Sequence, residues 1–184
     1  MSLLDIHLLG SPILRQETQA VAAVTDEHRR LIDDMLETMY AAKGIGLAAP
    51  QVGRLERIAV IDVDDNPMAI VNPEILRREG TVKGEEGCLS IPEVYGDVER
   101  AARVVVGALD RDGRAFEIEA SELLARCLQH EIDHLHGKLF LDYLSVLKRR
   151  SALAKWEKER KQFGSNIRKL SAGEIAGLNP GGEL

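Results

Sequence analysis

The stretch Ser121-Glu-Leu-Leu-Ala-Arg-Cys-Leu-Gln-His-Glu-Ile-Asp-His-Leu-His-Gly137 predicts an amphipathic helix that carries a chemical function. Its apolar residues recur every three or four positions, with Ser121 suited to precede the first turn and Gly137 to follow the last. His130 and His134 are four residues apart, so both imidazoles project from one helix face and converge on one point. We therefore expect this helix to bind one divalent metal ion.

Glu131 directly follows the first histidine, which completes the pattern HExxH. In such a helix the glutamate lies beside the ion without binding it. There it can take a proton from a water molecule on the ion and later deliver it to a leaving nitrogen. The three residues together favour a hydrolase that acts on a carbonyl compound.

An open catalytic metal site needs a third protein ligand besides the two histidines. Cys127 lies on the same helix face, but the ion should be level with residue 132, about 7.5 Å away along the axis. A thiol cannot reach that far, so we expect Cys127 to be a core residue. Cys88, from another part of the chain, is the better candidate.

Other ligand sets give alternative interpretations. In the extended pattern HExxHxxGxxH a histidine would stand at position 140, where the chain has Phe140, and this excludes that set. A metallo-endopeptidase would need Glu157 or Glu159 as its third ligand, and this stays an alternative. A further alternative is a non-catalytic metal-binding module that docks on nucleic acid through the basic segment near the C-terminus.

The composition is that of an ordinary globular protein. The 184 residues are 45% hydrophobic and 29% charged, which is typical of a single domain. No apolar run approaches the roughly 18 to 20 residues that a membrane span requires. The N-terminus has no basic segment followed by an apolar one, and two cysteines are too few for a disulfide framework. We expect a cytoplasmic protein.

The spacing of apolar residues predicts another helix over 26–42, with Thr25 at its start and Gly44 after its end. Short β-branched runs predict strands that pair as antiparallel hairpins, at 57–63, 69–71, 103–109 and 115–119. Because helices and strands do not alternate regularly, we expect an α+β fold. In it, antiparallel sheets should surround the HExxH helix.

The C-terminal region differs from the rest of the chain in charge. Residues 148–169 hold nine Lys and Arg against two Glu, a net charge of +7, which leaves −13 for the remainder of a chain whose total is −6. We expect a helix over about 146–169, with Leu147, Leu153 and Trp156 as its apolar face. The glycine-rich residues 171–184 should be a disordered tail, which makes 1–170 a single catalytic domain.

Three motifs together resemble those of the peptide deformylase family, in the same order and at similar separation. They are Gly44-Ile-Gly-Leu-Ala-Ala-Pro-Gln-Val-Gly53, Glu86-Gly-Cys-Leu-Ser90 and Gln129-His-Glu-Ile-Asp-His134. The N-terminal Gly10-Ser-Pro-Ile-Leu-Arg15 also looks like the start of that family. The similarity extends to about Tyr143.

The resemblance implies a role for each residue of the site. It implies that Glu131 is the general acid and base, and that Gln51 and the backbone N–H of Leu89 form an oxyanion hole for the tetrahedral intermediate. The metal ligands that it implies are Cys88, His130 and His134.

The resemblance also implies the substrate. The family removes the formyl group from the N-terminal formyl-methionine of newly made bacterial-type proteins and releases formate. The positions that would line the methionine pocket are Ile45, Leu123 and Cys127, with the backbone of Gly46 near the peptide. Arg126 departs from the family, in which an apolar residue is often found at this position. Either it changes the pocket or its charged end extends to solvent.

The metal and the partners are further expectations. Two histidines and a thiolate can hold Zn²⁺, Ni²⁺, Co²⁺ or Fe²⁺, and the general affinity order favours zinc over iron. The resemblance implies Fe²⁺ in the cell, and no organic cofactor is needed. The basic C-terminal helix suggests a ribosome contact near the peptide exit, although a merely solvated helix is the alternative. No membrane contact is expected.

Overall fold

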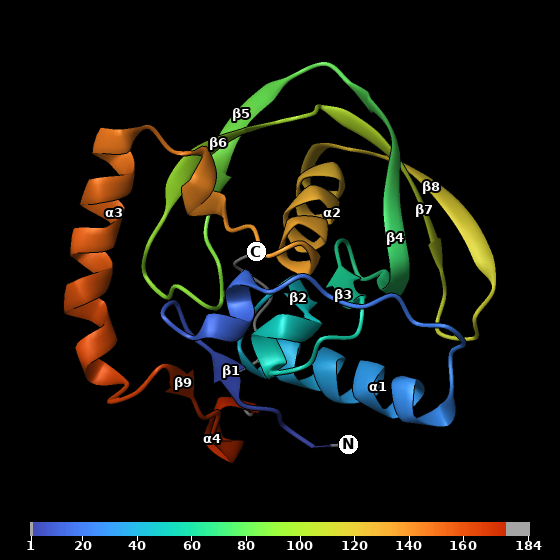
Figure 1. The fold of residues 1–184 in the computed structure, drawn as a ribbon, viewed down its shortest axis with the longest axis horizontal. Coiled ribbons are helices and arrows are strands. Elements are labelled where there is room, and N and C mark those ends of the chain that lie inside the picture. The colour runs from blue at the N-terminus through green and yellow to red at the C-terminus, as the bar shows by residue number, and fades with distance from the viewer. Residues whose placement is uncertain (1, 176–184) are drawn as a thin grey trace.

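The structure, a computed structural model, describes residues 2–175. Helix α2 (Glu122–Leu135) lies at the centre of the molecule with strands around it (Figure 1). Helix α1 (Asp26–Ala41) runs across one end, and α3 (Val146–Glu159) lies along one side, apart from the sheets. A short helix α4 (Ala172–Ile175) follows near the C-terminal end of the described chain.

The strands and the short 3₁₀ helices complete the architecture. The strands are β1 (Ile6–His7), β2 (Gly46–Ala48), β3 (Ile58–Asp62), β4 (Pro67–Glu79), β5 (Val82–Glu86), β6 (Gly96–Arg100), β7 (Arg103–Leu109), β8 (Ala115–Ser121) and β9 (Ile167–Arg168). The 3₁₀ helices are η1 (Pro12–Arg15), η2 (Ala49–Val52), η3 (Phe140–Tyr143) and η4 (Arg160–Gln162).

All strand pairs in these sheets are antiparallel. The largest sheet has five strands in the order β2-β3-β4-β7-β8, while β5 pairs with β6 and β1 with β9. The turn between β7 and β8 contains Gly113, whose φ of 79° suits the hairpin predicted there. The expected α+β fold, with antiparallel sheets around the HExxH helix, is confirmed.

The helices are held in place by their apolar faces. Helix α1 buries one stripe against β2 and β3, formed by Leu31, Ile32, Met35 and Met39. Helix α2 is buried on nearly all sides because β2, β3, β7, β8 and η2 surround it. Ser121 is the last residue of β8 and also precedes α2, so the chain passes directly from the sheet into the central helix.

The C-terminal helix is shorter than the sequence predicted. We expected it to extend over about 146–169, but α3 ends at Glu159 and is followed by η4. Gly164 adopts a φ of 69°, which ends helical structure, and β9 then pairs with β1. In the expected tail 171–184, four residues form α4, and 176–184 lie outside the described residues.

The apolar face expected on α3 is also only partly correct. Trp156 is buried and stacks on Phe163, with ring centroids 6.3 Å apart. Leu147 and Leu153, however, are 75% and 40% exposed. The buried residues of α3 are Ala152 and Trp156, and these two anchor the helix. The two leucines face solvent.

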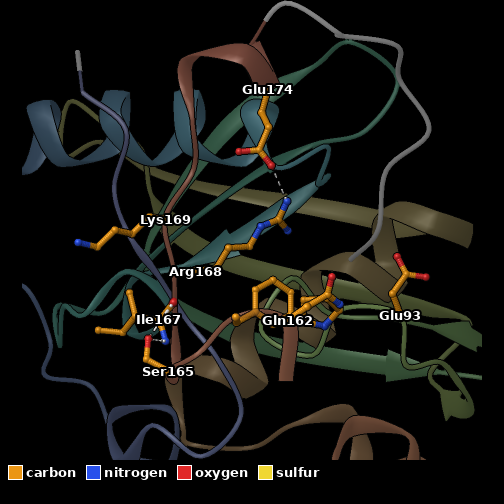
Figure 2. A pocket seen from close by; sticks show the side chains of 9 residues that line it. Glu93, Gln162, Ser165, Ile167, Arg168, Lys169 and Glu174 are labelled. Carbon is orange, nitrogen blue, oxygen red and sulfur yellow. Dashed lines mark hydrogen bonds and ion pairs between the residues drawn. The ribbon is translucent and has the colours of Figure 1, made fainter. Parts of the chain in front are cut away.

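A surface hollow of about 590 Å³ lies beside β9 and α4 (Figure 2). Within it, Arg168 forms an ion pair with Glu174 at 3.0 Å. None of the residues that line the hollow belongs to α2, so it is separate from the HExxH helix. Among residues 2–175, no helix is both long enough and apolar enough to cross a membrane.

Candidate metal centre

Cys88, His130 and His134 lie together in the interior. All three are buried, and one ligand atom from each lies within 4.8 Å of the others. His130 Nε2 is 3.2 Å from His134 Nε2, which in turn is 3.4 Å from Cys88 Sγ. Two nitrogen or sulfur ligands of one tetrahedral zinc ion lie roughly 3.3 to 3.6 Å apart. The three atoms therefore fit around a single ion.

Two structural elements bring these three side chains together. The histidines lie on the last two turns of α2, and Cys88 follows the end of β5 by two residues. The imidazole rings meet edge to face, with centroids 4.9 Å apart, and the ring of Phe140 packs nearly parallel to that of His130 at 6.4 Å. This packing restricts the orientation of the histidine rings.

The alternative third ligands lie elsewhere. Glu157 is exposed on α3 and forms an ion pair with Arg160, and Glu159 is on the same helix. Cys127 is completely buried, with its Sγ 3.7 Å from the carbonyl oxygen of Ile45. None of these glutamates or Cys127 joins the metal-binding cluster found in the described part of the chain.

Glu131 lies in the same interior region, and its side chain is fully buried. Neither of its carboxyl oxygens has a hydrogen-bond partner among the described residues, and the same is true of His134 Nδ1. Burial raises the pKa of Glu131 well above its usual value, and the nearby Glu86 carboxylate raises it further. Since buried polar atoms normally have partners, this orphaned carboxylate suggests that water or substrate binds there.

Gln51 is held at the cluster by both ends of its carboxamide. Its Oε1 accepts a hydrogen bond from the backbone N–H of Ala48 at 2.9 Å. Its Nε2 therefore points the other way, 3.5 Å from Cys88 Sγ and 3.1 Å from Ser90 Oγ. The amide thus presents its donor end to the cluster.

Leu89 is fixed immediately after the cysteine ligand. Its side chain is 2% exposed. A Cβ added at Gly44 would lie 2.6 Å from Leu89 Cδ1, so the missing side chain of Gly44 leaves the space that Leu89 fills. This contact fixes the side chain of Leu89, the residue that directly follows Cys88 in the chain.

Glu86 connects the cluster to a buried ionic network. Its Oε1 accepts hydrogen bonds from His130 Nδ1 and from Arg100 Nη2, each at 2.8 Å. Burial alone would raise the pKa of Glu86, but the hydrogen bonds from Arg100 and His130 outweigh it and hold the pKa well below its usual value. Because the ionised Glu86 accepts a hydrogen bond from the Nδ1–H of His130, the other ring nitrogen, Nε2, carries no proton and could bind an ion.

Arg100 joins this network to the surface. Its Nη1 donates to Asp133 Oδ2 at 2.5 Å, and its guanidinium lies 4.5 Å from the centroid of the Tyr143 ring. The Tyr143 hydroxyl also donates to Asp133, at 2.7 Å, and burial together with this hydrogen bond raises its pKa to about 12. Tyr143 therefore stays protonated and covers the outer end of the network.

The residues expected to line a methionine pocket differ in how deeply they are buried. Cys127 packs beneath Ile45, and burial raises the pKa of its thiol well above the usual value. Gly46 lies against the Glu131 side chain. Leu123, one helical turn before Cys127, is 48% exposed. Ile45, Gly46 and Cys127 thus lie in the interior near Glu131, while Leu123 lies at the surface.

The sequence reasoning gave no role to Glu86, Ser90, Arg100 or Asp133. Glu86 and Ser90 belong to the motif that carries Cys88, so their position was a usable signal. Arg100 has no local signal, because it reaches Glu86 only through the pairing of β5 with β6. The alternative that Arg126 extends to solvent is wrong, because this residue is 8% exposed and binds Glu86.

Comparison with known proteins is consistent with this geometry. The model of the family described as polypeptide deformylase matches residues 3–150. A peptide deformylase of Alkalilimnicola ehrlichii is 55% identical over 91% of this chain and 96% of its own length. A solved peptide deformylase of Legionella pneumophila superimposes with a TM-score of 0.85 at 47% identity, covering 88% of this chain and 97% of that one.

A second solved structure was determined with a bound compound. It is a peptide deformylase of Synechococcus elongatus in complex with actinonin. Its TM-score with this chain is 0.81 at 48% identity, and the match covers 84% of this chain and 86% of that one.

Proposed function

Since the chain belongs to the polypeptide deformylase family, we propose that it carries out the family's reaction at the cluster of Cys88, His130 and His134. The chain is a hydrolase that removes the formyl group from the N-terminal formyl-methionine of newly synthesised polypeptides and releases formate. The observation that carries the assignment of the site is the buried, unpartnered carboxylate of Glu131 next to His130.

Glu131 moves the proton in this reaction. A divalent ion on the three ligands would lower the pKa of a water molecule and polarise the formyl carbonyl. Glu131 accepts the proton of the attacking water and passes it to the amide nitrogen as the C–N bond breaks. The formyl carbon gains the water oxygen and leaves as formate, and the methionine nitrogen becomes a free amine. Neither oxygen of the buried Glu131 carboxyl is hydrogen-bonded within the described part of the chain, so both can take part in these proton transfers.

Gln51 and the backbone N–H of Leu89 stabilise the oxyanion of the tetrahedral intermediate. Support comes from the fixed carboxamide of Gln51, whose Oε1 is occupied by Ala48 so that only donors face the cluster. Donors that are already oriented need no reorganisation when charge develops on the oxygen. Neither group titrates near neutral pH, so this stabilisation should not change with pH in that range.

The methionine side chain binds along the surface formed by Ile45, Leu123 and Cys127, and the backbone of Gly46 binds the peptide. Support for an apolar surface comes from the hydrophobic cluster to which Cys127 belongs, because the partly buried Ile45 packs against that cluster. The exposure of Leu123 fits a residue at the entrance, where a substrate would cover it.

The ion in the cell is Fe²⁺, with Zn²⁺, Ni²⁺ and Co²⁺ able to occupy the same ligands. The donor set of one thiolate and two imidazoles suits all four ions, and affinity alone would favour zinc over iron. The assignment of iron therefore rests on the family. Metal analysis of anaerobically purified protein decides it: iron as the main ion is expected, and zinc in an equally active preparation would contradict it.

An assay on a formyl-methionyl peptide tests the reaction itself. We expect formate and free amine in equal amounts, loss of both after chelation, and recovery when Fe²⁺ is added. An acetyl-methionyl peptide and an unformylated peptide with the same sequence are the controls. Cleavage of internal peptide bonds in the unformylated peptide would instead favour the endopeptidase alternative.

Residues 1–170 form the catalytic domain of a cytoplasmic enzyme, which contacts the ribosome through α3 and the basic residues after it. The net charge of +7 over 148–169, beside −13 elsewhere, supports an attraction of this side of the molecule to RNA. The exposure of Leu147 and Leu153 also supports a contact there. Activity of a chain that ends at Leu170 tests the domain limit, and cosedimentation with ribosomes tests the contact.

A further inference from the structure

Arg126 makes a set of contacts that ties α2 to the β5–β6 hairpin. Although it lies on a helix, it is 8% exposed. Its Nη1 donates to Glu86 Oε2 at 2.7 Å and to the carbonyl oxygen of Val98 at 2.9 Å. Its Nη2 donates to the carbonyl oxygen of Val82 at 3.1 Å. One guanidinium therefore binds both strands of the hairpin and the carboxylate at the end of β5.

The hairpin has a gap that matches this guanidinium. A Cβ added at Gly84 would lie 3.0 Å from Arg126 Nη2 and 3.1 Å from Cζ. These separations are shorter than ordinary carbon contacts, so any larger residue at position 84 would press on the guanidinium. Gly84 and Arg126 thus form a matched pair, in which the missing side chain of one leaves room for the other.

The carboxylate of Glu86 is fully engaged as a result. Oε1 accepts from His130 and Arg100, and Oε2 accepts from Arg100 Nε at 2.9 Å and from Arg126. A carboxylate has about four acceptor positions, so these four hydrogen bonds leave it no freedom to rotate. Of the two hydrogen bonds to Oε2, the one from Arg126 comes from helix α2 and the other comes from Arg100 on β6. Oε1 consequently stays directed at His130 Nδ1.

We propose that Arg126, paired with Gly84, is a positioning residue that fixes Glu86 and through it the orientation of the metal ligand His130. The proposal rests on the proposed function, because it takes His130 as a ligand. Arg126 has no hydrogen bond to Cys88, His130 or His134, and it is linked to His130 through Glu86, which binds both residues. Residues that orient a ligating histidine typically change metal affinity 10- to 100-fold when they are altered.

The first test is the metal affinity of Arg126→Met, measured by competition between the purified protein and a chelator for Co²⁺. We expect an affinity about tenfold weaker than that of the wild type, since Arg100 still binds Glu86. Arg103→Met is the matched control, because Arg103 pairs with Glu119 on the exposed sheet, with side chains 56% and 53% exposed. Arg126→Lys should give an intermediate affinity, because one ammonium cannot reach Glu86 and both strands together.

Urea unfolding of the metal-free variants separates positioning from folding. If Arg126→Met lowers stability but leaves Co²⁺ affinity unchanged, Arg126 is structural and the proposal is overturned. If the wild type itself binds no Co²⁺, or Cys88→Ser binds it equally well, the proposed metal site fails instead. The two failures are therefore distinguishable.

A double-variant cycle tests the pairing with Gly84. Gly84→Ala alone should weaken Co²⁺ binding, because the added methyl group displaces the guanidinium from Glu86. In the Arg126→Met background the same substitution should have no further effect on affinity, since the guanidinium is gone. Equal effects of Gly84→Ala in both backgrounds would show that the two residues act independently, and would overturn the pairing.

Discussion

Gly46 lies directly against the carboxylate of Glu131. A Cβ added at Gly46 would be 2.8 Å from Glu131 Cδ, closer than real Cβ atoms approach other atoms. Gly46 is the first residue of β2, and Glu131 is on α2, so the strand and the helix meet at this point without a side chain between them. The position of the Glu131 carboxylate thus depends on a residue that has no side chain.

Gly46→Ala should displace the Glu131 carboxylate while leaving the metal ligands in place. A shift of about 1 Å in a reacting group can lower the rate about 100-fold, and we expect a decrease in kcat of that order. Formate release and metal content are the measurements. Gly173→Ala is the control, because a Cβ there would lie 3.8 Å from the nearest atom. Unchanged kcat in Gly46→Ala would mean that Glu131 tolerates displacement.

Glu131→Ala should keep the ion and the fold but lose the proton transfer. General acid–base catalysis contributes about 10²- to 10⁴-fold, so we expect kcat to fall by at least this range. Burying a carboxyl that has no hydrogen-bond partner costs folding free energy, and the substitution removes this cost. Loss of the charge should therefore not lower the free energy of unfolding measured in urea. Formate release at saturating substrate measures the effect, and full activity would refute the role of Glu131.

The sequence was sufficient to predict the central helix and the three residues that cluster as a possible metal-binding group. HExxH on an amphipathic helix led to His130, His134 and Glu131, and the distance argument against Cys127 led to Cys88. The periodicity of α1 and the β-branched runs of β3, β7 and β8 were equally informative. These features depend on local spacing, which a sequence displays directly.

The features that were missed depend on tertiary contacts. Strands β5 and β6 are polar and rich in charged residues, so no hydrophobic alternation marks them. Arg126 was expected to alter a pocket or extend to solvent, but whether a helical arginine is buried depends on the carboxylate that faces it, here Glu86. The expected length of the last helix was wrong because β9 pairs with β1, at the other end of the chain.

The two cysteines should respond differently to the same substitution. Cys88→Ser should lose the bound ion or exchange it, because a hydroxyl is a much weaker ligand than a thiolate. Cys127→Ser should keep the ion and lose about 1–3 kcal/mol of unfolding free energy from its buried hydroxyl. Metal content and urea unfolding of both variants are the measurements. The reverse pattern would show that Cys127 is the ligand.

Binding to ribosomes should depend on the basic residues after the start of α3. Lys158, Arg160 and Lys161 are exposed, and reversing all three to Glu changes the local charge by −6. We expect the intact chain to cosediment with ribosomes at low salt and less so at moderate salt, because contacts with phosphate weaken as salt rises. The variant should lose this binding but keep its activity on a formyl-methionyl peptide. The matched control reverses Arg77, Arg78 and Arg103, which are exposed on the five-stranded sheet. If the α3 reversals leave binding unchanged, or both triple variants lose it equally, no specific docking occurs through this segment, and its charge serves only to keep the helix solvated.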